Sequence, residues 1–219
     1  METKAENFAS ELIERQWLSP KSFEITLTKP KSFEYLPGQC IRLIHDAVER
    51  DYSLVTAPTD PNLALCIRNI EGGILSPELS NAPVGSRFNF NGPHGYFTFR
   101  PSKRPAVFVA TGTGLAPFVS MARSGVAGFI LLHGVNSAKD LYYTSVFKSA
   151  AKQYLPCISE TDKLAGEYFR GRVTDYMQKN LSPEIYDFYL CGRREMIRDV
   201  TFLVDERFPG SFIFTETFF

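Results

Sequence analysis

The pattern of apolar residues changes near Arg100–Pro105, and this change constrains the fold more than any other feature of the chain. Before it, short alternating runs are separated by proline and glycine turns, which is typical of an antiparallel barrel or sandwich. After it, apolar runs alternate with helical stretches, which predicts a parallel sheet with helices on both faces. We therefore expect two lobes, an antiparallel β-barrel in residues 1–101 and an α/β domain with a parallel sheet in residues 102–219.

The two patterns place the expected elements along the chain. The first lobe is expected to hold strands at Phe23–Thr28, Gln39–His45, Asp51–Val55, Leu63–Asn69 and Arg87–Asn91. The second is expected to hold strands at Ala106–Ala110, Phe129–His133, Leu155–Ser159, Phe188–Cys191 and Phe212–Thr215, and helices from about Leu115 and over Tyr142–Gln153, Val173–Lys179 and Glu195–Phe208. The N-terminal residues METKAENFASELIERQW are polar and helix-like.

Charge and hydropathy exclude several classes of protein. Twenty-four basic residues balance twenty-four acidic ones, which argues against bulk binding to nucleic acid or to an anionic membrane. The N-terminus lacks the apolar stretch of a signal peptide, and no run reaches transmembrane length. We therefore expect a cytoplasmic protein without membrane insertion.

The cysteines and histidines give no metal-binding pattern. Cys40, Cys66, Cys157 and Cys191 lie far apart, and their spacings fit neither a zinc site nor a plant-type iron–sulfur cluster. His94 and His133 are each a lone histidine beside a turn or strand, so we interpret both as structural. No metal is expected.

The strongest nucleotide signal is the segment Thr111–Pro117, TGTGLAP, which follows an expected strand and opens a helix. Glycines let the backbone approach a pyrophosphate closely, and the positive end of the helix favours that charge. The segment is not GxGxxG, and a purely structural turn is the competing interpretation.

Two segments of the first lobe have similar chemistry. In Arg50-Asp51-Tyr52-Ser53, a guanidinium suits a phosphate, a tyrosine ring can lie on a planar heterocycle and a hydroxyl can bond to a ring nitrogen. In Gly72–Pro77, GGILSP, a turn precedes a short helix for which Ser76 is the expected N-cap and Pro77 the first helical residue. Taken alone, Arg50 is equally well a solvated charge, and GGILSP a plain capped turn.

In this order, the segments resemble the ferredoxin–NADP⁺ reductase family, especially its compact bacterial members. The resemblance covers nearly the whole chain. Besides the segments above, it rests on Pro37–Gln39, Gly92–Phe97, His133–Val135, Asp140–Tyr143, Gly171–Val173, Leu190–Gly192 and Thr215–Phe219. It implies an FAD-binding barrel, a five-stranded α/β lobe that binds NADPH or NADH, and site residues at the matching positions.

The resemblance assigns roles residue by residue. Arg50 would hold the FAD pyrophosphate, Tyr52 would stack on the isoalloxazine and Ser53 would hydrogen-bond near the flavin N5. Cys191 would sit beside the nicotinamide C4, and Glu216 near the flavin edge. Ser53, Cys191 and Glu216 are therefore the expected catalytic residues. The expected cofactor-binding residues are Arg50, Asp51, Tyr52, Ser53, Ile67, Ile74, Leu75, Ser76, Gly112, Thr113, Gly114, Arg172, Gly192, Arg193, Phe218 and Phe219.

The chain departs from the family where NADPH-preferring relatives place arginines around the 2′-phosphate. Asn136 stands where an arginine is common, and Ser159-Glu160-Thr161 stands in place of Ser-Arg-Glu, which leaves only Arg172 of that set. Glu160 would disfavour a 2′-phosphate and could accept from ribose hydroxyls. Arg193 or Arg194 could instead supply the missing charge. We expect weak discrimination, with tolerance of NADH.

The resemblance predicts an enzyme that transfers electrons between NAD(P)H and a separate carrier such as ferredoxin or flavodoxin, acting as a monomer or weak dimer. One alternative is a flavin reductase that releases its flavin. Another is a redox-sensing or electron-transfer subunit of a larger complex.

Overall fold

The computed structural model describes residues 6–45, 48–160 and 168–218. Contacts divide the chain into two compact units, and each is described by itself. The barrel unit comprises Met1–Phe99 and Ala116–Ser124, and the α/β unit comprises Arg100–Leu115 and Gly125–Phe219. The expected domain boundary after residue 101 stays a prediction. In the part of the chain that the structure describes, no helix has the length and apolarity needed to cross a membrane.

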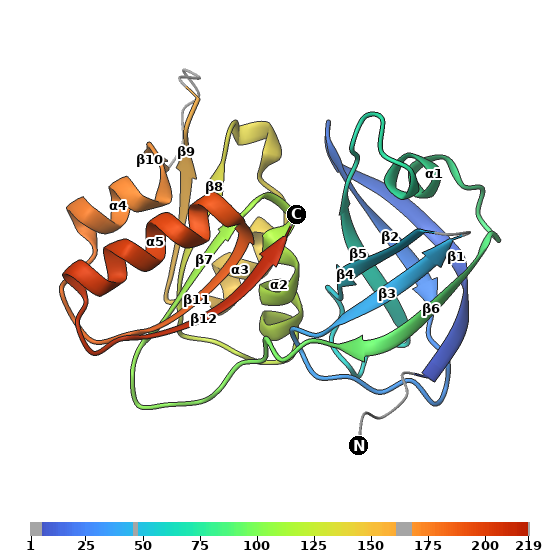
Figure 1. Ribbon diagram of the computed structural model, residues 1–219, viewed down its shortest axis with the longest axis horizontal. Helices are drawn as coiled ribbons and strands as arrows, with labels where there is room; N and C mark the ends of the chain where they lie inside the picture. Colours follow the sequence, from blue (N-terminus) through green and yellow to red (C-terminus); the bar gives the residue numbers. More distant parts are fainter. Residues whose placement is uncertain (1–5, 46–47, 161–167, 219) are drawn as a thin grey trace. The chain divides into compact units, whose positions relative to one another are not determined.

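The barrel unit is built on one six-stranded antiparallel sheet (Figure 1). Its strands are β1 (Glu6–Ser19), β2 (Ser22–Thr28), β3 (Cys40–His45), β4 (Val48–Ser53), β5 (Asn62–Arg68) and β6 (Arg87–His94), in the order β4-β3-β6-β1-β2-β5. Just past β4, Leu54 forms an antiparallel bridge with Leu65 of β5, and Val55 N donates to Ala64 O at 2.9 Å. The two outer strands meet there, so the expected antiparallel barrel is confirmed.

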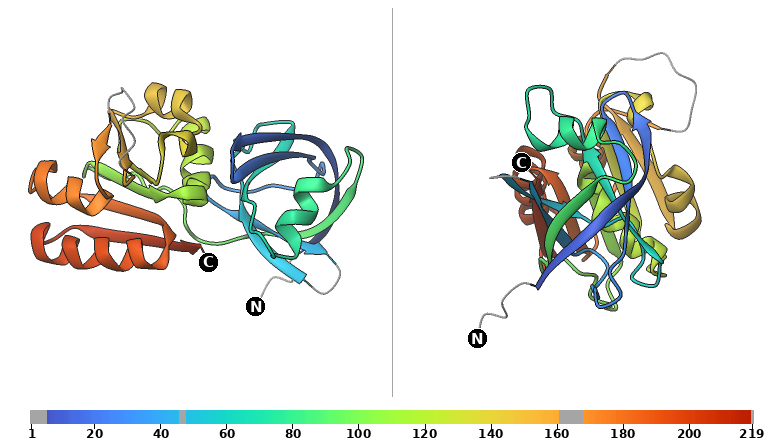
Figure 2. Two further views of the ribbon diagram at one scale, coloured as in Figure 1. Left: turned by 90° about the horizontal axis from the view of Figure 1, so that it is seen from above. Right: turned by 90° about the vertical axis from the view of Figure 1, so that its right-hand side faces the viewer.

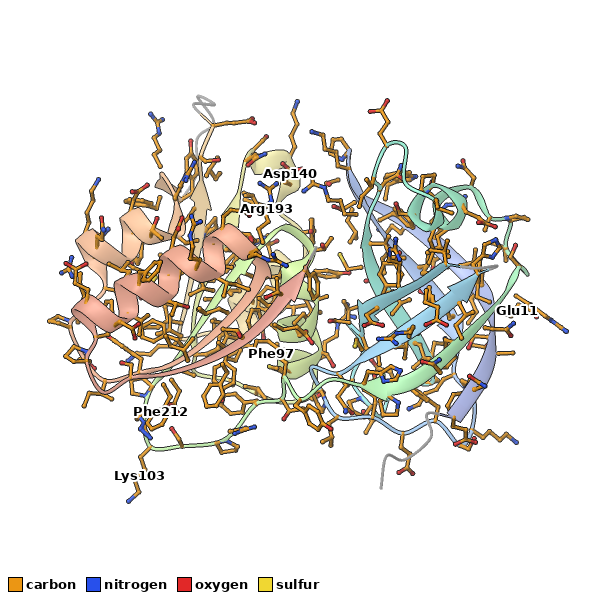
Figure 3. All side chains as sticks on the ribbon, in the orientation of Figure 1. Glu11, Phe97, Lys103, Asp140, Arg193 and Phe212 are labelled. Atoms are coloured by element: carbon orange, nitrogen blue, oxygen red, sulfur yellow. The ribbon has the colours of Figure 1, made fainter. Side chains whose placement is uncertain are left out.

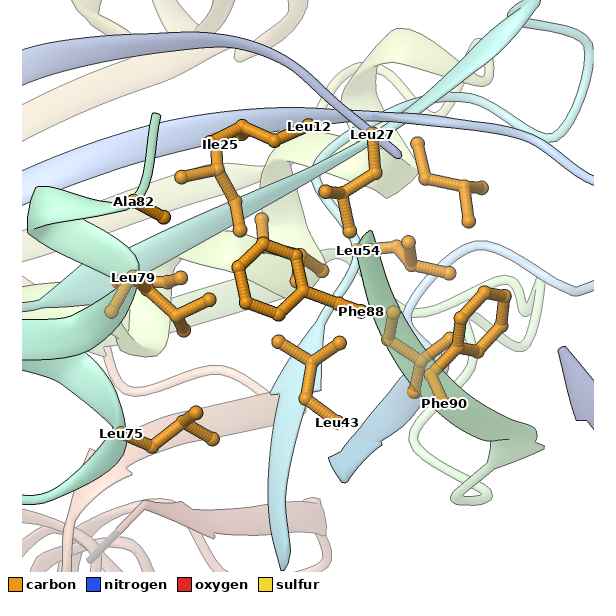
Figure 4. Close-up of a cluster of buried hydrophobic side chains, with 14 of the residues drawn as sticks. Leu12, Ile25, Leu27, Leu43, Leu54, Leu75, Leu79, Ala82, Phe88 and Phe90 are labelled. Carbon is orange, nitrogen blue, oxygen red and sulfur yellow. The ribbon is translucent and has the colours of Figure 1, made fainter. Parts of the chain in front are cut away.

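Alternating apolar side chains of the strands fill the barrel (Figure 4). Helix α1 (Leu75–Asn81) contributes Leu75 and Leu79 to the same core. The strands contribute mainly large residues: Leu12, Phe23, Ile25, Leu27, Ile41, Leu43, Leu63, Leu65, Ile67, Phe88 and Phe90. This period of two is what a strand with one buried face requires.

The N-terminal segment is a strand, so its interpretation as helix-like was wrong. Strand β1 runs over Glu6–Ser19 and pairs with β6 through its first part and with β2 through its second. Buried Ser10 and Leu12 alternate with exposed Ala9 and Glu11, which places one face of the strand inside the barrel. Two backbone ladders and this buried face outweigh the weak local preference for helix.

The α/β unit holds a six-stranded parallel sheet in the order β10-β9-β8-β7-β11-β12. The strands are β7 (Ala106–Thr111), β8 (Ile130–Val135), β9 (Gln153–Ile158), β10 (Phe169–Arg170), β11 (Asp187–Arg193) and β12 (Phe212–Phe218). The two-residue strand β10 is a sixth member beside the five that were expected. Because parallel strands are buried on both faces, the central ones read as continuous apolar runs.

Helices lie on both faces of this sheet (Figure 2), as the alternating pattern predicted. Helices α4 (Val173–Asn180) and α5 (Arg194–Arg207) cover one face, and α3 (Thr144–Ala150) lies on the other. Helix α3 is shorter than expected, because Gln153 already begins β9. Short 3₁₀ turns occupy Gly112–Leu115 and Ala138–Asp140, and α2 (Ala116–Arg123) follows the first of these.

Candidate functional site

The glycine turn of the α/β unit is fixed by backbone packing. Strand β7 leads into the 3₁₀ turn Gly112–Leu115 and then into α2, the order that the sequence predicted. A Cβ at Gly114 would lie 2.4 Å from the carbonyl oxygen of Cys191, so only glycine fits there. Gly112 has φ +56°, and nothing lies within 4 Å of where its Cβ would stand. The turn thus packs against β11 at Gly114 and leaves open space at Gly112.

The carboxyl end of β11 meets the same turn. Gly192 has φ +140°, and a Cβ there would lie 2.3 Å from Thr111 Oγ1. Arg193 N donates to that hydroxyl at 3.2 Å. The expected residues Gly112, Gly114, Gly192 and Arg193 therefore gather at one edge of the sheet, around Thr111.

Cys191 and Glu216 lie side by side on neighbouring strands. They are register partners in the parallel pair β11–β12, so the fold brings the two predicted catalytic residues together. Cys191 is fully buried, and burial, with a smaller effect of the Glu216 charge, raises the pKa of its thiol well above the usual value. The thiol is therefore neutral near pH 7. Phe218 is paired with Arg193, while Phe219 lies outside the described residues.

Residues at the carboxyl ends of β8, β9 and β10 form a second cluster in the α/β unit. Glu160 N donates to Asn136 O at 2.9 Å, and the side-chain oxygens of Ser159 and Asn136 are 3.5 Å apart. Arg172 lies just after β10 and caps α4, with its backbone N–H donating to Asp175 Oδ2 at 2.8 Å. The residues expected near the nucleotide ribose thus share one edge, except Thr161, which lies outside the described residues.

On β4 of the barrel unit, Arg50 and Tyr52 project to the same side. Arg50 is exposed, and its Nη1 donates to Glu49 O at 2.7 Å. Tyr52 is half-buried against the barrel core, and burial raises the pKa of its hydroxyl to about 12. Ser53 is buried at the end of the strand. An exposed guanidinium beside a half-buried ring suits a phosphate and a flat heterocycle.

Asp51 points to the other side of β4 and has a partner there. Arg42 donates to both of its oxygens, at 2.6 Å from Nε and 2.9 Å from Nη2. The hydrogen bonds to Asp51, and after them the Asp51 charge, raise the pKa of Arg42 above its usual value. The structure therefore engages Asp51 in a surface pair with β3 (side chains 39% and 47% exposed).

The start of α1 differs from its sequence-based description. The helix begins at Leu75 with Ile74 as N-cap, so the expectation that Ser76 is the N-cap and Pro77 the first helical residue was wrong. Ser76 Oγ accepts from Ile70 N at 3.1 Å, because the hydroxyl closes the Ile70–Gly73 turn instead of capping the helix. Ile74 is 65% exposed, whereas Leu75 and Ser76 are buried.

The structure also shows the surroundings of Ile67, a predicted cofactor-binding residue, and of the two histidines interpreted as structural. Ile67 is buried in the barrel core, so only its main chain is available to a cofactor. His133 is fully buried with Nδ1 3.0 Å from Tyr154 Oη, and burial lowers its pKa to about 3. His94 Nε2 lies 2.6 Å from Asn91 Oδ1. Within residues 6–45, 48–160 and 168–218, no three metal-ligating side chains gather as a metal site would need.

Sequence reasoning missed Arg100 and Arg104, which pack on aromatic rings of β12. The sequence does contain two arginines in the segment that joins the lobes, and two phenylalanines, Phe212 and Phe214, whose spacing puts both on one face of a strand. Neither pattern is specific alone, because their proximity depends on the fold.

Known proteins share both halves of this arrangement. The family of oxidoreductase FAD-binding domains matches residues 10–99, and that of oxidoreductase NAD-binding domains matches residues 108–201. Ferredoxin–NADP reductase B of Sorangium cellulosum is 33% identical over 224 residues, covering 89% of this chain and 89% of that protein. A ferredoxin NADP⁺ reductase from Neisseria gonorrhoeae, solved with bound FAD and NADP, has a TM-score of 0.83 at 22% identity and covers 99% of this chain and 100% of that one.

Longer relatives match as well. The 2-halobenzoate 1,2-dioxygenase electron transfer component of Burkholderia cepacia is 30% identical over 220 residues, which cover 92% of this chain. The chain spans 64% of that component's length. Two domain matches and a relative of 33% identity aligned over most of both proteins show the same relationship that the sequence motifs indicated. The chain belongs to the ferredoxin–NADP⁺ reductase family of oxidoreductases, with an FAD-binding barrel and an NAD-binding α/β domain.

Proposed function

We propose that the chain oxidises NADH or NADPH and passes the electrons, by way of FAD, to a separate one-electron carrier such as ferredoxin or flavodoxin. The observation that carries this proposal is the Cys191–Glu216 pair, held beside the Thr111–Gly114 turn at one edge of the sheet. A bound flavin supplies the chemistry that side chains lack, because it takes two electrons as hydride and returns them singly.

In the barrel unit, the residues on β4 and at the start of α1 would hold FAD. The exposed Arg50 would bind the pyrophosphate, and the half-buried Tyr52 would lie on the ring system. Ser53 would donate near the ring nitrogen, and the main chain around the exposed Ile74 would face the phosphates, with Ser76 holding the preceding turn in place. Ile67 would contribute its main chain.

In the α/β unit, Gly112, Thr113 and Gly114 would border the pyrophosphate of the nicotinamide nucleotide. Cys191 would sit beside the nicotinamide as a neutral, compact group, since burial keeps its thiol protonated. Glu216 would be the nearest charge on β12. These residues orient and shield the reacting groups, which is the main contribution that geometry makes to hydride transfer.

The carrier is proposed as a separate protein. None of the four cysteines has the spacing of a plant-type iron–sulfur cluster, so this chain lacks that means of one-electron transfer. Several relatives are described as electron transfer components of dioxygenases and another as a ferredoxin–NADP reductase, which supports a separate redox carrier such as ferredoxin. We further propose a cytoplasmic monomer or weak dimer.

The second cluster supports tolerance of NADH. Asn136, Ser159 and Glu160 lie together, the Glu160 side chain is exposed, and the family resemblance would place a 2′-phosphate beside these residues. A carboxylate repels a phosphate and accepts well from ribose hydroxyls. Arg172 supplies a positive charge nearby, so we expect the chain to use both nucleotides with weak discrimination.

Anaerobic titration of the purified protein with NADH and with NADPH tests the proposed function. A yellow protein whose flavin absorbance is bleached by either nucleotide, and restored by a one-electron acceptor, supports it. A colourless protein that reduces only added flavin would identify a flavin reductase. A yellow protein that neither nucleotide reduces would identify a subunit without this activity.

Replacing Glu160 by arginine tests the nucleotide preference. If Glu160 sets it, the ratio of kcat/KM for NADPH to that for NADH should rise about tenfold, since about 1.4 kcal/mol is sufficient. Glu184→Arg is the matched control, because Glu184 is also exposed but precedes β11 at the opposite edge of the sheet. The hypothesis fails if the wild type already prefers NADPH by orders of magnitude or if Glu160→Arg leaves the ratio unmoved.

A further inference from the structure

The segment Arg100–Pro105, here called the strap, packs along β11 and β12 of the α/β unit. Its composition is that of a linker, yet its first residue is held at two points. Arg100 N donates to Tyr189 Oη at 3.0 Å, and the Arg100 guanidinium lies 5.2 Å from the centre of the Phe214 ring. The strap is therefore anchored to the α/β unit from its beginning.

A second anchor lies further along the strap. The Ser102 hydroxyl donates to Asp187 Oδ2, and Arg104 Nε lies 3.2 Å from Asp187 Oδ1. The Arg104 guanidinium also lies 4.2 Å from the centre of the Phe212 ring. Asp187 is 5% exposed, so these contacts supply the partners that a buried carboxylate requires. Together the two anchors fix the strap at both ends.

The first anchor forms a closed three-layer stack. The Phe214 ring stacks on that of Tyr189, with centres 4.7 Å apart and planes 22° from parallel. Tyr189 is fully buried and contacts the edge of Phe108. The Arg100 guanidinium lies over the Phe214 ring, and the Tyr189 hydroxyl accepts from the Arg100 backbone. Arg100, Phe214 and Tyr189 are therefore each in contact with the other two.

This stack lies one strand repeat from the predicted hydride-transfer residues. Tyr189 and Phe214 are register partners, and so are Cys191 and Glu216, two residues further along the same strands. Because side chains alternate, each residue of the second pair projects on the same side as its neighbour in the stack. Among the described residues, strand β12 is the outer strand of the sheet and pairs only with β11; helix α5 packs against it, and the strap contacts its Phe212 and Phe214 rings.

We propose that Arg100 is a positioning residue that holds Glu216 beside Cys191, acting through the Phe214–Tyr189 stack. This inference rests on the proposed function only in giving Cys191 and Glu216 a role in hydride transfer. The contacts of Arg100 with Phe214 and Tyr189 are present in the structure whatever the activity of the chain. Loss of the guanidinium should loosen the carboxyl half of β12 while the centre of the sheet stays ordered, because Tyr189 remains buried between its neighbours.

The test compares Arg100→Ala with Lys103→Ala in the FAD-loaded protein. Lys103 is a cation of the same strap whose side chain points away from the sheet (Figure 3). Hydrogen exchange of the β12 amides gives a structural readout, and kcat and KM for NADH with ferricyanide as acceptor give a functional one. Tyr189→Phe, which removes only the hydroxyl, serves as a second variant if Arg100→Ala folds poorly.

We expect exchange in Thr215–Phe218 to rise about tenfold in Arg100→Ala and kcat to fall about tenfold, with KM within about twofold of wild type. Arg100→Lys should restore little, because a lysine lacks the planar group that stacks. Exchange that rises equally in all strands, or a loss of kcat without local exchange, or the same loss in Lys103→Ala, would overturn the proposal. A wild type that is inactive with NADH and NADPH would instead refute the proposed function, and the exchange result would still test the anchor.

Discussion

The two units build their candidate sites in different ways. In the α/β unit, Gly114 and Gly192 press against backbone and hydroxyl atoms, so the shape of the site is set by main-chain packing. In the barrel unit, Arg50 and Asp51 are exposed side chains; Arg50 donates to the Glu49 carbonyl and Asp51 accepts from Arg42. We therefore predict that one added methyl group at the glycine turn of the α/β unit destabilises the fold. Substitution of the exposed β4 side chains in the barrel unit should change cofactor binding but leave the fold intact.

The largest effect is expected for Gly114→Ala. Its Cβ would stand 2.4 Å from the Cys191 carbonyl oxygen, which forces the turn off β11. We expect a loss of about 3 kcal/mol of unfolding free energy and a rise of at least about tenfold in KM for the nicotinamide nucleotide. Urea unfolding and steady-state kinetics measure the two.

Gly112→Ala is the matched control for that variant. It meets no atom within 4 Å and has only its φ of +56° to strain it, so about 1 kcal/mol is expected. Equal losses for the two variants would show that backbone packing does not set the shape of this site.

Acid should unfold the α/β unit first, because it buries the neutral His133. The pKa of this imidazole falls to about 3 through burial, against about 6.5 in the unfolded chain. The unfolded state therefore binds the extra proton between these values, and stability is lost as pH falls below about 6.5, by about 1.4 kcal/mol per pH unit. At pH 4.5 the loss is about 2–3 kcal/mol, and His133→Phe should remove most of it.

Two optical probes separate the units in this experiment. The single tryptophan, Trp17, lies on β1 of the barrel unit, while helices α3, α4 and α5 belong to the α/β unit. On acidification, helical circular dichroism should fall before tryptophan fluorescence changes. His94→Gln in the barrel unit is the control and should leave the order unchanged. Coincident transitions in wild type and in His133→Phe would contradict the prediction.

Arg50→Ala should affect binding and leave the fold intact. A charge-assisted bond to a phosphate contributes about 1.5–3 kcal/mol, so the Kd for FAD should rise at least about tenfold. Because Arg50 is exposed, the apo-protein should unfold within about 0.5 kcal/mol of wild type. Isothermal titration with FAD and urea unfolding measure these, with exposed Arg87→Ala as control. Full retention of FAD by Arg50→Ala would show that the assignment is wrong.

The smallest effect is expected for Asp51→Asn. The bidentate pair with Arg42 is solvent-exposed, and such pairs contribute less than about 1 kcal/mol. We expect that loss in urea unfolding and a Kd for FAD within about twofold of wild type, since the side chain faces Arg42. A large loss of FAD affinity would instead assign Asp51 to the cofactor, as the sequence resemblance implied.

Local patterns predicted most strands and the order of the lobes, because alternation and glycine turns act over a few residues. The Thr111–Pro117 turn is the clearest case, since the strand, the glycines and the helix start are all contiguous. The pairs that matter in the site are not contiguous. Cys191 and Glu216 meet only because β12 returns parallel to β11, and family resemblance, not spacing, indicated them.

The sequence by itself therefore determined the two lobes, the strand and helix periods, and the segments able to hold phosphates. Tertiary structure alone decided that Glu6–Ser19 is a strand, that Ser76 closes a turn instead of capping α1, and that the strap is anchored on β12. In each case the local signal is weak, worth a few tenths of a kcal/mol per residue, and long-range pairing and burial outweigh it.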